Sequence, residues 1–414
     1  MQVEEIANKI KEKGGSLYLV GGAVRNKFLN LEIHDEDYCV CGLTEEEFIK
    51  LFPNAKPRGK AFKVFDLDGK EFALARKDVK KGLGHKDFEI QSNPNITIEE
   101  DLYRRDITIN SIAQDVLTKE IIDPFNGIKD IQNKIIRATS LSFKDDPLRV
   151  YRVARFASQL EFNVDVDTIE LMKSMKNELS TLSKERVFEE LKKALATDKP
   201  SIFFEVLRKA DVLDAHFKEI NDLIGVLQPE KYHPEGDAYN HTMLVLDYVS
   251  QNAKDLSIRF SALVHDLGKG LTPKKEYPHH YGHEDKGVTL VGTLGNRIGA
   301  KNEWIKAGKV ACREHMRGGI FYKMKPSTKV DFIERVSKTK LGLDGLQLIV
   351  NADKLSGGRI PQGNFNFADI GKKCLEEVNG DFIKQKYNIK EGIEFYKILR
   401  QERIEWIKQL HFDM

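Results

Sequence analysis

The sequence predicts an α+β protein in which a small head with a mixed sheet precedes helical domains. Short β-rich runs and helical segments are mixed only in the first third of the chain, which indicates a small sheet with helices beside it. From about residue 146 onward, apolar residues recur at helical spacing. At 414 residues, of which 41% are apolar, the chain is long enough for two to four domains with cores of their own.

The expected domains follow these shifts in pattern. We assign the head to residues 1–137 and a helical neck or body to residues 138–228. A second helical domain, rich in histidine, is expected at 229–360, and a charged helical tail at 361–414. Pro229 and the segment 232–236 predict a linker between the two helical domains, because proline and glycine interrupt helices.

Five β-rich runs are expected to form the strands of the head. They cover residues 16–20, 37–41, 62–66, 71–75 and 107–115. Residues 77–95 have no clear period and contain the polar, glycine-bearing stretch 80–86, so we expect a mobile loop there.

Composition limits the classes of function. The formal net charge is +2, so a nucleic-acid surface has to be a local basic patch rather than a global charge. The sequence has no N-terminal apolar segment with a cleavage site and no run of 18 apolar residues, which predicts neither secretion nor membrane spanning. The four cysteines contain no C-x-x-C pair, which favours a reduced cytoplasm.

Two acids in the second expected strand are the first candidate site. Asp35 and Asp37 alternate along the chain, so in a strand they share one face, while Glu36 points the other way. Two converging carboxylates suit Mg²⁺, which takes further ligands from water and substrate phosphates. The alternative is a solvated strand end. Glu71, on a later strand, is either a third acid of this site or a surface residue.

A phosphate site is expected just upstream of these acids. Gly21 and Gly22 expose backbone N–H groups at the start of a helix that carries Arg25, and a phosphate can approach closely there. A metal site beside a phosphate cradle indicates nucleotidyl transfer. In that chemistry one cation activates the attacking hydroxyl group and a second supports the leaving oxygen.

Two further clusters carry arginine. Arg104 and Arg105 can bind phosphates as rigid forks, or Arg105 can form a structural network with Asp106. Asp146 and Arg149 are three residues apart, so they are neighbours on one helix face. Asp146 before a proline equally fits a helix N-cap.

Asp146 and Arg149 also match the base edge of cytosine and adenine. The acid can accept from an exocyclic amine while the arginine donates to a ring nitrogen, and uracil and guanine present the opposite pattern. Each buried polar group left without a hydrogen-bond partner costs ~1–3 kcal/mol, which lets the protein discriminate cytosine and adenine from uracil and guanine without a template strand. Arg152, one turn further along, would point toward the triphosphate.

Four motifs occur in order: Gly-Gly-Ala-Val-Arg at 21–25, Asp-x-Asp at 35–37, Arg-Arg-Asp-x-Thr-Ile-Asn at 104–110 and Asp-Pro-Leu-Arg-x-x-Arg-x-x-Arg-Phe at 146–156. In this order they resemble the class II CCA-adding enzymes, which are tRNA nucleotidyltransferases. The resemblance runs over residues 17–195 and resumes in the C-terminal domain. It implies a polymerase β-like head.

The resemblance also implies roles for residues. Asp35 and Asp37 would be catalytic and hold Mg²⁺, and Asp146 and Arg149 would replace a nucleic-acid template. The residues that would contact CTP or ATP are Gly22, Arg25, Arg105, Asp146, Arg149 and Arg152. Asp145 stands where the family usually has Glu, and the loop at 77–95 falls where the family has the element that switches from C to A addition.

The second helical domain contains a histidine–aspartate pair followed by Gly-Lys. His265 and Asp266 in this setting resemble the HD phosphohydrolases. That resemblance adds His241 upstream and Asp353 downstream as metal ligands, with His265 and Asp266 at the catalytic centre. Mixed imidazole and carboxylate ligation favours a transition metal such as Ni²⁺, Mn²⁺ or Co²⁺ over Mg²⁺ alone, and the metal would generate hydroxide.

Four other histidines in this domain offer ligand or phosphate contacts, or are ordinary surface or capping residues: His279, His280, His283 and His315. The resemblance to CCA-adding enzymes that carry an HD domain implies that this domain has 2′,3′-cyclic phosphodiesterase, 2′-nucleotidase and phosphatase activities.

The sequence therefore predicts a cytoplasmic enzyme that builds or repairs the 3′-terminal CCA of tRNA from CTP and ATP, with a fused HD phosphohydrolase and no membrane contact. Basic pairs at 80–81 and 192–193 are candidates for tRNA contact. A homodimer is one expected state, which the sequence does not decide. The alternatives are a poly(A) polymerase or A-adding enzyme, and a non-catalytic RNA-binding protein.

Overall fold

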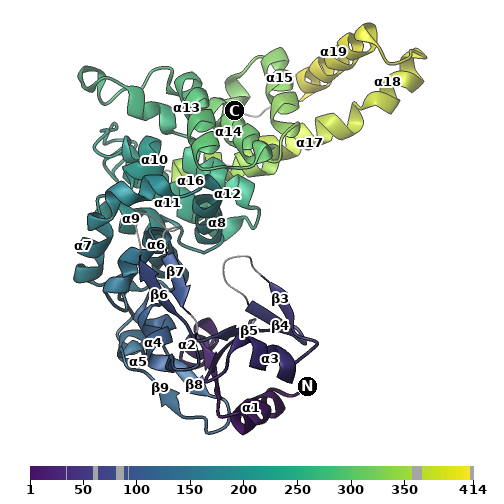
Figure 1. The fold of residues 1–414 in the computed structure, drawn as a ribbon. Coiled ribbons are helices and arrows are strands. Elements are labelled where there is room, and N and C mark those ends of the chain that lie inside the picture. Colours follow the sequence, from purple (N-terminus) through teal and green to yellow (C-terminus); the bar gives the residue numbers. More distant parts are fainter. Residues whose placement is uncertain (34, 59–63, 81–87, 92, 357–365, 411–414) are drawn as a thin grey trace. The chain divides into compact units, whose positions relative to one another are not determined.

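The computed structural model describes the chain except residues 34, 59–63, 81–87, 92, 357–365 and 411–414 (Figure 1). The chain forms two compact units. The first comprises Met1–Ser183 with Ile202–Val212, and the second comprises Lys184–Ser201 with Leu213–Met414. The predicted α+β architecture, a mixed-sheet head followed by helices, is confirmed.

A seven-stranded mixed sheet forms the head, with the strand order β3-β4-β5-β2-β1-β8-β9. Its strands are β1 (Ser16–Val20), β2 (Asp37–Cys41), β3 (Lys56–Arg58), β4 (Val64–Leu67), β5 (Lys70–Leu74), β8 (Ala113–Asp115) and β9 (Ile121–Ile122). Neighbouring strands are antiparallel except β2 and β5, which are parallel. The first four predicted strands are confirmed within one or two residues in the described part of the chain, as β1, β2, β4 and β5.

Five helices accompany the sheet in the described part of the head, and two of them begin at a capping threonine. They are α1 (Val3–Glu12), α2 (Gly22–Leu29), α3 (Glu45–Leu51), α4 (Ile98–Tyr103) and α5 (Gly127–Gln132). Thr44 and Thr97 cap α3 and α4. The hydroxyl of each threonine accepts from the backbone N–H of a glutamate three residues later, and the carboxylate of that glutamate accepts from the backbone N–H of the threonine. The apolar stripe of α1 is buried beside β1.

Two sequence expectations for the head are wrong. Part of the expected loop at 77–95 is an antiparallel hairpin of β6 (Lys77–Lys80) and β7 (Phe88–Gln91), whereas 81–87 lie outside the described residues. The expected strand at 107–115 begins as a 3₁₀ helix, η1 (Thr108–Asn110), because a buried hydrogen bond to a distant part of the chain holds its first residue. The Thr108 hydroxyl donates to Asp130 at 2.7 Å.

The neck continues the first unit. Its elements are β10 (Ile135–Ile136), η2 (Leu141–Asp145), α6 (Leu148–Leu160), β11 (Asn163–Val164), α7 (Val166–Ser174), η3 (Lys176–Thr181) and α9 (Ser201–Lys209). Helix α6 is buried along most of its length, which explains its dense apolar pattern. Strand β10 precedes α6 and β11 follows it, and the two strands pair in parallel.

The second unit is helical. Its main elements are α8 (Lys184–Leu195), α10 (Asp214–Asn221), α11 (Ala238–Asn252), α12 (Leu256–Val264), η4 (Leu267–Leu271), η5 (Lys274–Glu276), α13 (His283–Arg297), α14 (Asn302–Gly319), η6 (Phe321–Lys323), α15 (Pro326–Ser337) and α16 (Gly342–Ser356). Helices α11, α12, α14 and α16 share one buried apolar core.

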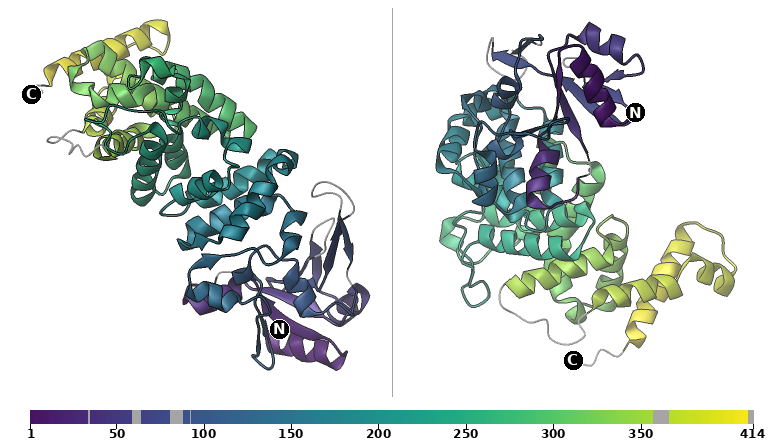
Figure 2. Two further views of the ribbon diagram at one scale, coloured as in Figure 1. Left: turned by 90° about the vertical axis from the view of Figure 1, so that its left-hand side faces the viewer. Right: turned by 90° about the horizontal axis from the view of Figure 1, so that it is seen from below.

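The end of this unit is a helical tail, α17 (Phe367–Glu377), α18 (Gly380–Tyr387) and α19 (Ile393–Gln409) (Figure 2). Val378, Ile383, Phe395 and Leu399 form its small apolar cluster. Within the described residues, none of the helices combines the length and hydropathy that a membrane crossing requires.

The expected linker around 229–236 is a closed loop inside the second unit rather than a free connection. Leu227 and Asp237 form a β-bridge across its base, and the N–H of Gln228 donates to the carbonyl of Gly236 at 3.3 Å. The loop therefore holds its residues against the start of α11.

Candidate functional site

The Gly-Gly turn lies between β1 and α2, as the sequence predicts. Gly21 has a φ of 70°, a left-handed conformation that favours glycine, and a Cβ atom there would lie 3.1 Å from Nη1 of Arg105. Helix α2 then begins at Gly22. Arg25 on its first turn is only 5% exposed and donates to Oδ1 of Asn110 at 2.6 Å.

The two acids differ in their local structure. Asp37 is the first residue of β2, but Asp35 precedes the strand, so the prediction of both acids on one strand is wrong by two residues. Both are exposed. The carboxylate of Glu36 accepts from the hydroxyl of Tyr38 at 2.9 Å.

The sheet register brings a third acid beside them. Asp37 pairs with Glu71 of β5 in the parallel ladder. The pKa of Asp37 is raised, first by the loss of solvation beside the protein and then by the negative charges of Glu71 and Asp35, against the opposing charge of Arg105. An added cation would relieve this repulsion, so the oxygen donors here fit a hard divalent ion.

Asp101 holds both arginines of the Arg-Arg pair. Its carboxylate accepts from Arg104 at 2.6 Å and from Arg105 at 3.0 Å, with 1% of the Asp101 side chain exposed. Asp106 pairs instead with Arg152 at 2.7 Å. The suggested network between Arg105 and Asp106 is therefore wrong in its partners, because each acid faces a different arginine.

The arginines of α6 determine the charge state of Asp106. Burial alone would raise its pKa, but Arg152 and Arg149 lower it to about 2. Asp106 thus stays ionised and links η1 to α6.

Asp146 and Arg149 stand at the start of α6. The carboxylate of Asp146 accepts from the N–H of Leu148 at 3.0 Å, while Pro147 takes the N-cap position, so Asp146 lies one residue before the expected cap. The Arg149 guanidinium donates to the carbonyls of Ser142 at 2.6 Å and Arg104 at 2.7 Å, which fixes its orientation. Arg149 is 9% exposed.

An aromatic ring that the sequence reasoning missed lies among these arginines. The guanidinium carbons of Arg25, Arg152 and Arg155 lie 5.3, 5.6 and 3.8 Å from the ring centre of Phe156. The pKa of Arg25 falls to about 10, because burial and the charges of Arg155 and Arg152 oppose its protonation. This positive cluster suits an anion such as a triphosphate.

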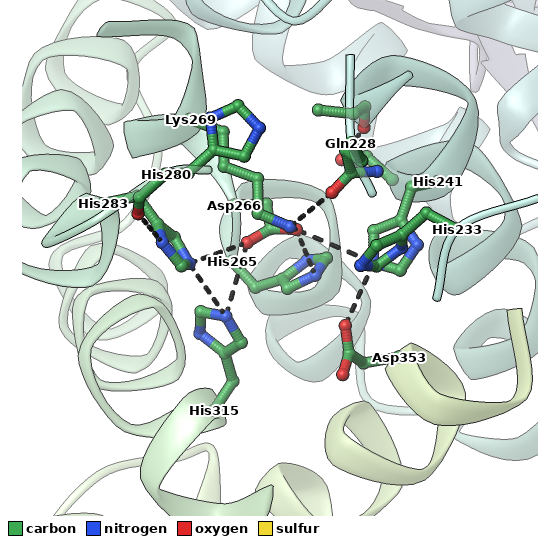
Figure 3. A network of polar contacts seen from close by, with 12 residues as sticks. Gln228, His233, His241, His265, Asp266, Lys269, His280, His283, His315 and Asp353 are labelled. Carbon is green, nitrogen blue, oxygen red and sulfur yellow. Dashed lines mark hydrogen bonds and ion pairs between the residues drawn. The ribbon is translucent and has the colours of Figure 1, made fainter. Parts of the chain in front are cut away.

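The second unit brings together all four predicted HD residues (Figure 3). His241 comes from α11, His265 and Asp266 follow α12, and Asp353 comes from α16. Nε2 of His241 lies 3.1 Å from Asp353 and 3.6 Å from Asp266, and Nε2 of His265 lies 3.3 Å from Asp266. His241, His265 and Asp266 have no exposed surface.

The backbone fixes the proton of His265. Its Nδ1 lies 2.7 Å from the carbonyl oxygen of Ala262, which can only accept a hydrogen bond. Nδ1 therefore carries the proton and the lone pair of the neutral ring is on Nε2, which has no hydrogen-bond partner among the described residues. This donor arrangement fits a metal ion.

A buried lysine contacts the aspartate of this site. Lys269 donates to Oδ2 of Asp266 at 2.6 Å and to Gln228 at 2.7 Å. Burial would raise the pKa of Asp266, but Lys269 and His265 hold it well below its usual range. The carboxylate is therefore available as an anionic ligand.

Glu235 is a second residue that the sequence reasoning missed. Its carboxylate accepts from Nδ1 of His233 at 2.9 Å and Nδ1 of His241 at 2.7 Å. Burial would raise the pKa of Glu235, but these two histidines lower it to about 2. A carboxylate on the far nitrogen orients a metal-binding histidine. The signal in the sequence was a histidine and a glutamate shortly before His241.

The four additional histidines separate into two pairs. Nε2 of His283 and Nε2 of His315 both lie 3.3 Å from Asp266. His280 is held by Thr272 and by the carbonyl of Leu227, both at 3.0 Å, and the exposed ring of His279 stacks on Tyr281.

Three family models match the chain in order. They are the poly A polymerase head domain at residues 17–137, a probable RNA-binding and SrmB-binding site of polymerase A at 161–224, and the HD domain at 238–356. The first covers the Gly-Gly turn and the acids of the head, and the third covers the four predicted HD residues. The residues at the start of α6 lie between the first and second matches.

Solved structures of CCA-adding enzymes are similar over almost the whole chain. An apo form has a TM-score of 0.66 at 19% identity and covers 99% of this chain and 92% of its own. A complex with CTP has a TM-score of 0.64 at 20% identity and covers 100% and 93%. The Thermotoga maritima enzyme complexed with tRNA CCA has a TM-score of 0.64 at 18% identity and covers 99% and 91%.

The chain thus joins a poly A polymerase head domain to an HD domain through a helical neck. The fold is similar to that of solved CCA-adding enzymes over almost the whole chain, and the three family models follow one another in the order head, RNA-binding site and HD domain. The predicted resemblance is confirmed at this level.

Proposed function

We propose that this protein adds or repairs the 3′-terminal CCA of tRNA from CTP and ATP without a nucleic-acid template. The observation that carries the proposal is the arrangement of the head. Asp37 of β2 pairs with Glu71 of β5, Asp35 directly precedes β2, and an arginine cluster lies on α2 and α6. The similarity of the fold to CCA-adding enzymes, including complexes with ATP and with CTP, supports it.

In the proposed reaction the 3′-hydroxyl oxygen of tRNA attacks the α-phosphorus of the nucleotide. A new P–O bond forms, the bond to pyrophosphate breaks, and the hydroxyl proton leaves to solvent. Asp35 and Asp37 would hold Mg²⁺, which supplies charge neutralisation at the phosphates. Arg25 and Arg152 would bind the triphosphate, and the backbone at Gly22 would admit it closely.

Base choice is assigned to Asp146 and Arg149. The carbonyls of Ser142 and Arg104 hold the guanidinium before any nucleotide binds, so little side-chain entropy is lost on recognition. The carboxylate would accept from the exocyclic amine of cytosine or adenine, while the guanidinium would donate to the ring nitrogen. Arg105 is proposed to contact the nucleotide from beside the Gly-Gly turn.

The second proposed activity is that of a metal-dependent phosphohydrolase. His241, His265, Asp266 and Asp353 would hold a transition metal, which supplies a hydroxide nucleophile. The expected substrates are RNA ends that carry a 2′,3′-cyclic phosphate or a terminal phosphate. With tRNA as substrate and four free cysteines, the cytoplasm is the proposed location.

The name of the head family favours one rival, a poly(A) polymerase or an A-adding enzyme. Purified protein incubated with tRNA lacking its terminus and with each labelled nucleotide distinguishes the two. We expect two cytidines to be added before one adenosine. Adenosine addition without prior cytidine would replace the proposal by the rival, and no addition of either would favour a non-catalytic RNA-binding protein.

A further inference from the structure

Gln228 is a buried residue beside the HD site that does not belong to the proposed metal set. It lies directly before the closed loop at 229–236, and only 6% of its surface is exposed. Its amide oxygen accepts from Nζ of Lys269 at 2.7 Å, and the same ammonium group donates to Oδ2 of Asp266 at 2.6 Å (Figure 3). Lys269 therefore links Gln228 to a predicted metal ligand.

The contact with Lys269 fixes the orientation of the Gln228 amide. An ammonium group has three donors and no acceptor, so the amide oxygen has to face it. The amide nitrogen therefore presents its two N–H groups elsewhere. This nitrogen is buried and has no hydrogen-bond partner within the described part of the chain. A buried donor without a partner destabilises a folded protein, so an acceptor from outside the chain is expected here.

Backbone contacts on both sides hold Gln228 in place. Its own N–H donates to the carbonyl of Gly236 at 3.3 Å, next to the β-bridge between Leu227 and Asp237. The carbonyl of Leu227 accepts from Nε2 of His280 at 3.0 Å, which joins this segment to the loop before α13. The unpartnered donor is therefore part of a fixed site rather than of a freely rotating surface side chain.

The surroundings of the amide indicate the chemistry of its partner. The partner has to accept hydrogen bonds, and the ammonium group of Lys269 favours a negative charge beside it. Lys269 is itself 6% exposed and pairs with Asp266, so the amide belongs to the same buried site as the metal set. The non-bridging oxygens of a phosphate ester only accept hydrogen bonds and are negatively charged. A phosphoryl group that enters the HD site therefore meets both conditions.

We propose that Nε2 of Gln228 donates to a non-bridging phosphoryl oxygen of the phosphate ester that binds at the HD site. This deepens the phosphohydrolase activity proposed above and rests on it. In that reaction the oxygen of water forms a new P–O bond, the ester P–O bond breaks, and a proton of the water ends on the leaving oxygen. A fixed donor binds and orients the phosphoryl group without reorganisation during the reaction.

The test distinguishes this contact from a role in which Gln228 only orients Lys269. In Gln228→Glu the side chain can still accept from Lys269, but an oxygen replaces the donor nitrogen. The full-length protein is assayed with adenosine 2′,3′-cyclic phosphate, with orthophosphate as a competing inhibitor, and its metal content is measured by atomic emission. The control is Gln251→Glu, which makes the same charge change at an exposed residue of α11.

The expected result is a loss of phosphate recognition without a loss of metal. In Gln228→Glu, kcat/KM should fall about 10–100-fold, because a hydrogen bond to a charged group is lost. Inhibition by orthophosphate should weaken in the same direction, and the metal content should equal that of the wild type. Gln251→Glu should keep all three wild-type values.

The other outcomes separate the two proposals. Wild-type constants in Gln228→Glu would overturn the contact with phosphate and leave the phosphohydrolase assignment standing. No hydrolysis by the wild-type protein with Ni²⁺, Mn²⁺ or Co²⁺ supplied would overturn both. If Gln228→Glu changes the metal content, a cycle of Gln228→Met and Lys269→Met decides. Additive losses support the direct contact, and a double variant as active as Lys269→Met contradicts it.

Discussion

The head site and the HD site are built in opposite ways. In the head, Asp35 and Asp37 are exposed at the start of β2, the central strand of the sheet, and the nearby arginines are held by Asp101, Asp106 and backbone carbonyls. In the HD domain, nitrogen atoms of buried histidines already converge with carboxylate oxygens in a group that could hold a metal ion. In the proposed function the head would admit a nucleotide and an RNA end, so substrate would complete its cation site, whereas the side chains of the HD site are already arranged around one another.

The largest expected effect comes from removing the two acids of the head, which should abolish one activity and leave the other. Asp35→Ala with Asp37→Ala should lower nucleotide addition at least about 10³-fold, because a metal ion contributes several kcal/mol of charge stabilisation at phosphate. Labelled-nucleotide incorporation into tRNA measures this, with tRNA affinity and phosphohydrolase activity unchanged. Glu36→Gln is the matched control, because Glu36 accepts from Tyr38 instead. Incorporation by the double variant at the rate of the control would contradict the assignment.

The reciprocal change acts on the HD domain. His265→Ala should lower phosphohydrolase activity about 10²-fold or more and reduce the metal content, because a lost ligand weakens the ion that supplies hydroxide. Nucleotide addition should stay at the wild-type rate. His279→Ala, at an exposed histidine, is the control. Equal loss of both activities would mean that the two sites are not independent.

A smaller effect is expected from Glu235, which orients His241 without belonging to the four-residue metal set. Glu235→Gln should weaken metal binding about 10–100-fold. Loss of a carboxylate that is hydrogen-bonded to the far nitrogen of a metal-binding histidine typically lowers metal affinity by this factor. Calorimetric titration with Co²⁺ measures it, and exposed Glu230→Gln is the control. The pH dependence of metal binding should also shift in Glu235→Gln. An unchanged affinity would show that the contact is only structural.

The smallest effect concerns the stability of the head. The pKa of Asp106 is lowered to about 2, so its contribution is complete above about pH 4 and is lost as the pH falls through about 2. Asp106→Asn should lower the free energy of unfolding at pH 7 by about 2 kcal/mol, with the difference disappearing toward pH 2. Urea unfolding at several pH values measures this against the exposed control Asp167→Asn. A difference independent of pH would contradict the ionic account.

Local patterns predicted most of the fold. The strands at 16–20 and 37–41 are short β-rich runs, and the segments after residue 146 have a clear helical period, so both kinds of element could be predicted from the sequence. The 3₁₀ helix at Thr108–Asn110 was not, because its buried bond to Asp130 joins residues far apart in the chain. Part of the expected loop at 77–95 is a hairpin, since strand pairing can override weak periodicity.

The sequence predicted which residues belong to the candidate sites, but not which residues interact with one another. His241, His265, Asp266 and Asp353 were named from motifs, and the fold brings them together. Which arginine faces which acid in the head depends on tertiary contacts, so the partners of Asp101 and Asp106 could not be predicted. The sequence also gave no means of choosing His283 and His315 over His279 and His280.

A structure of the full-length protein with CTP and Mn²⁺ tests the head most directly. The account predicts the cytosine amino group against the carboxylate of Asp146, the ring nitrogen within hydrogen-bond distance of Arg149, and an ion shared by Asp35, Asp37 and the triphosphate. A cytosine ring distant from Arg149, or a triphosphate whose ion does not touch the two acids, would contradict it.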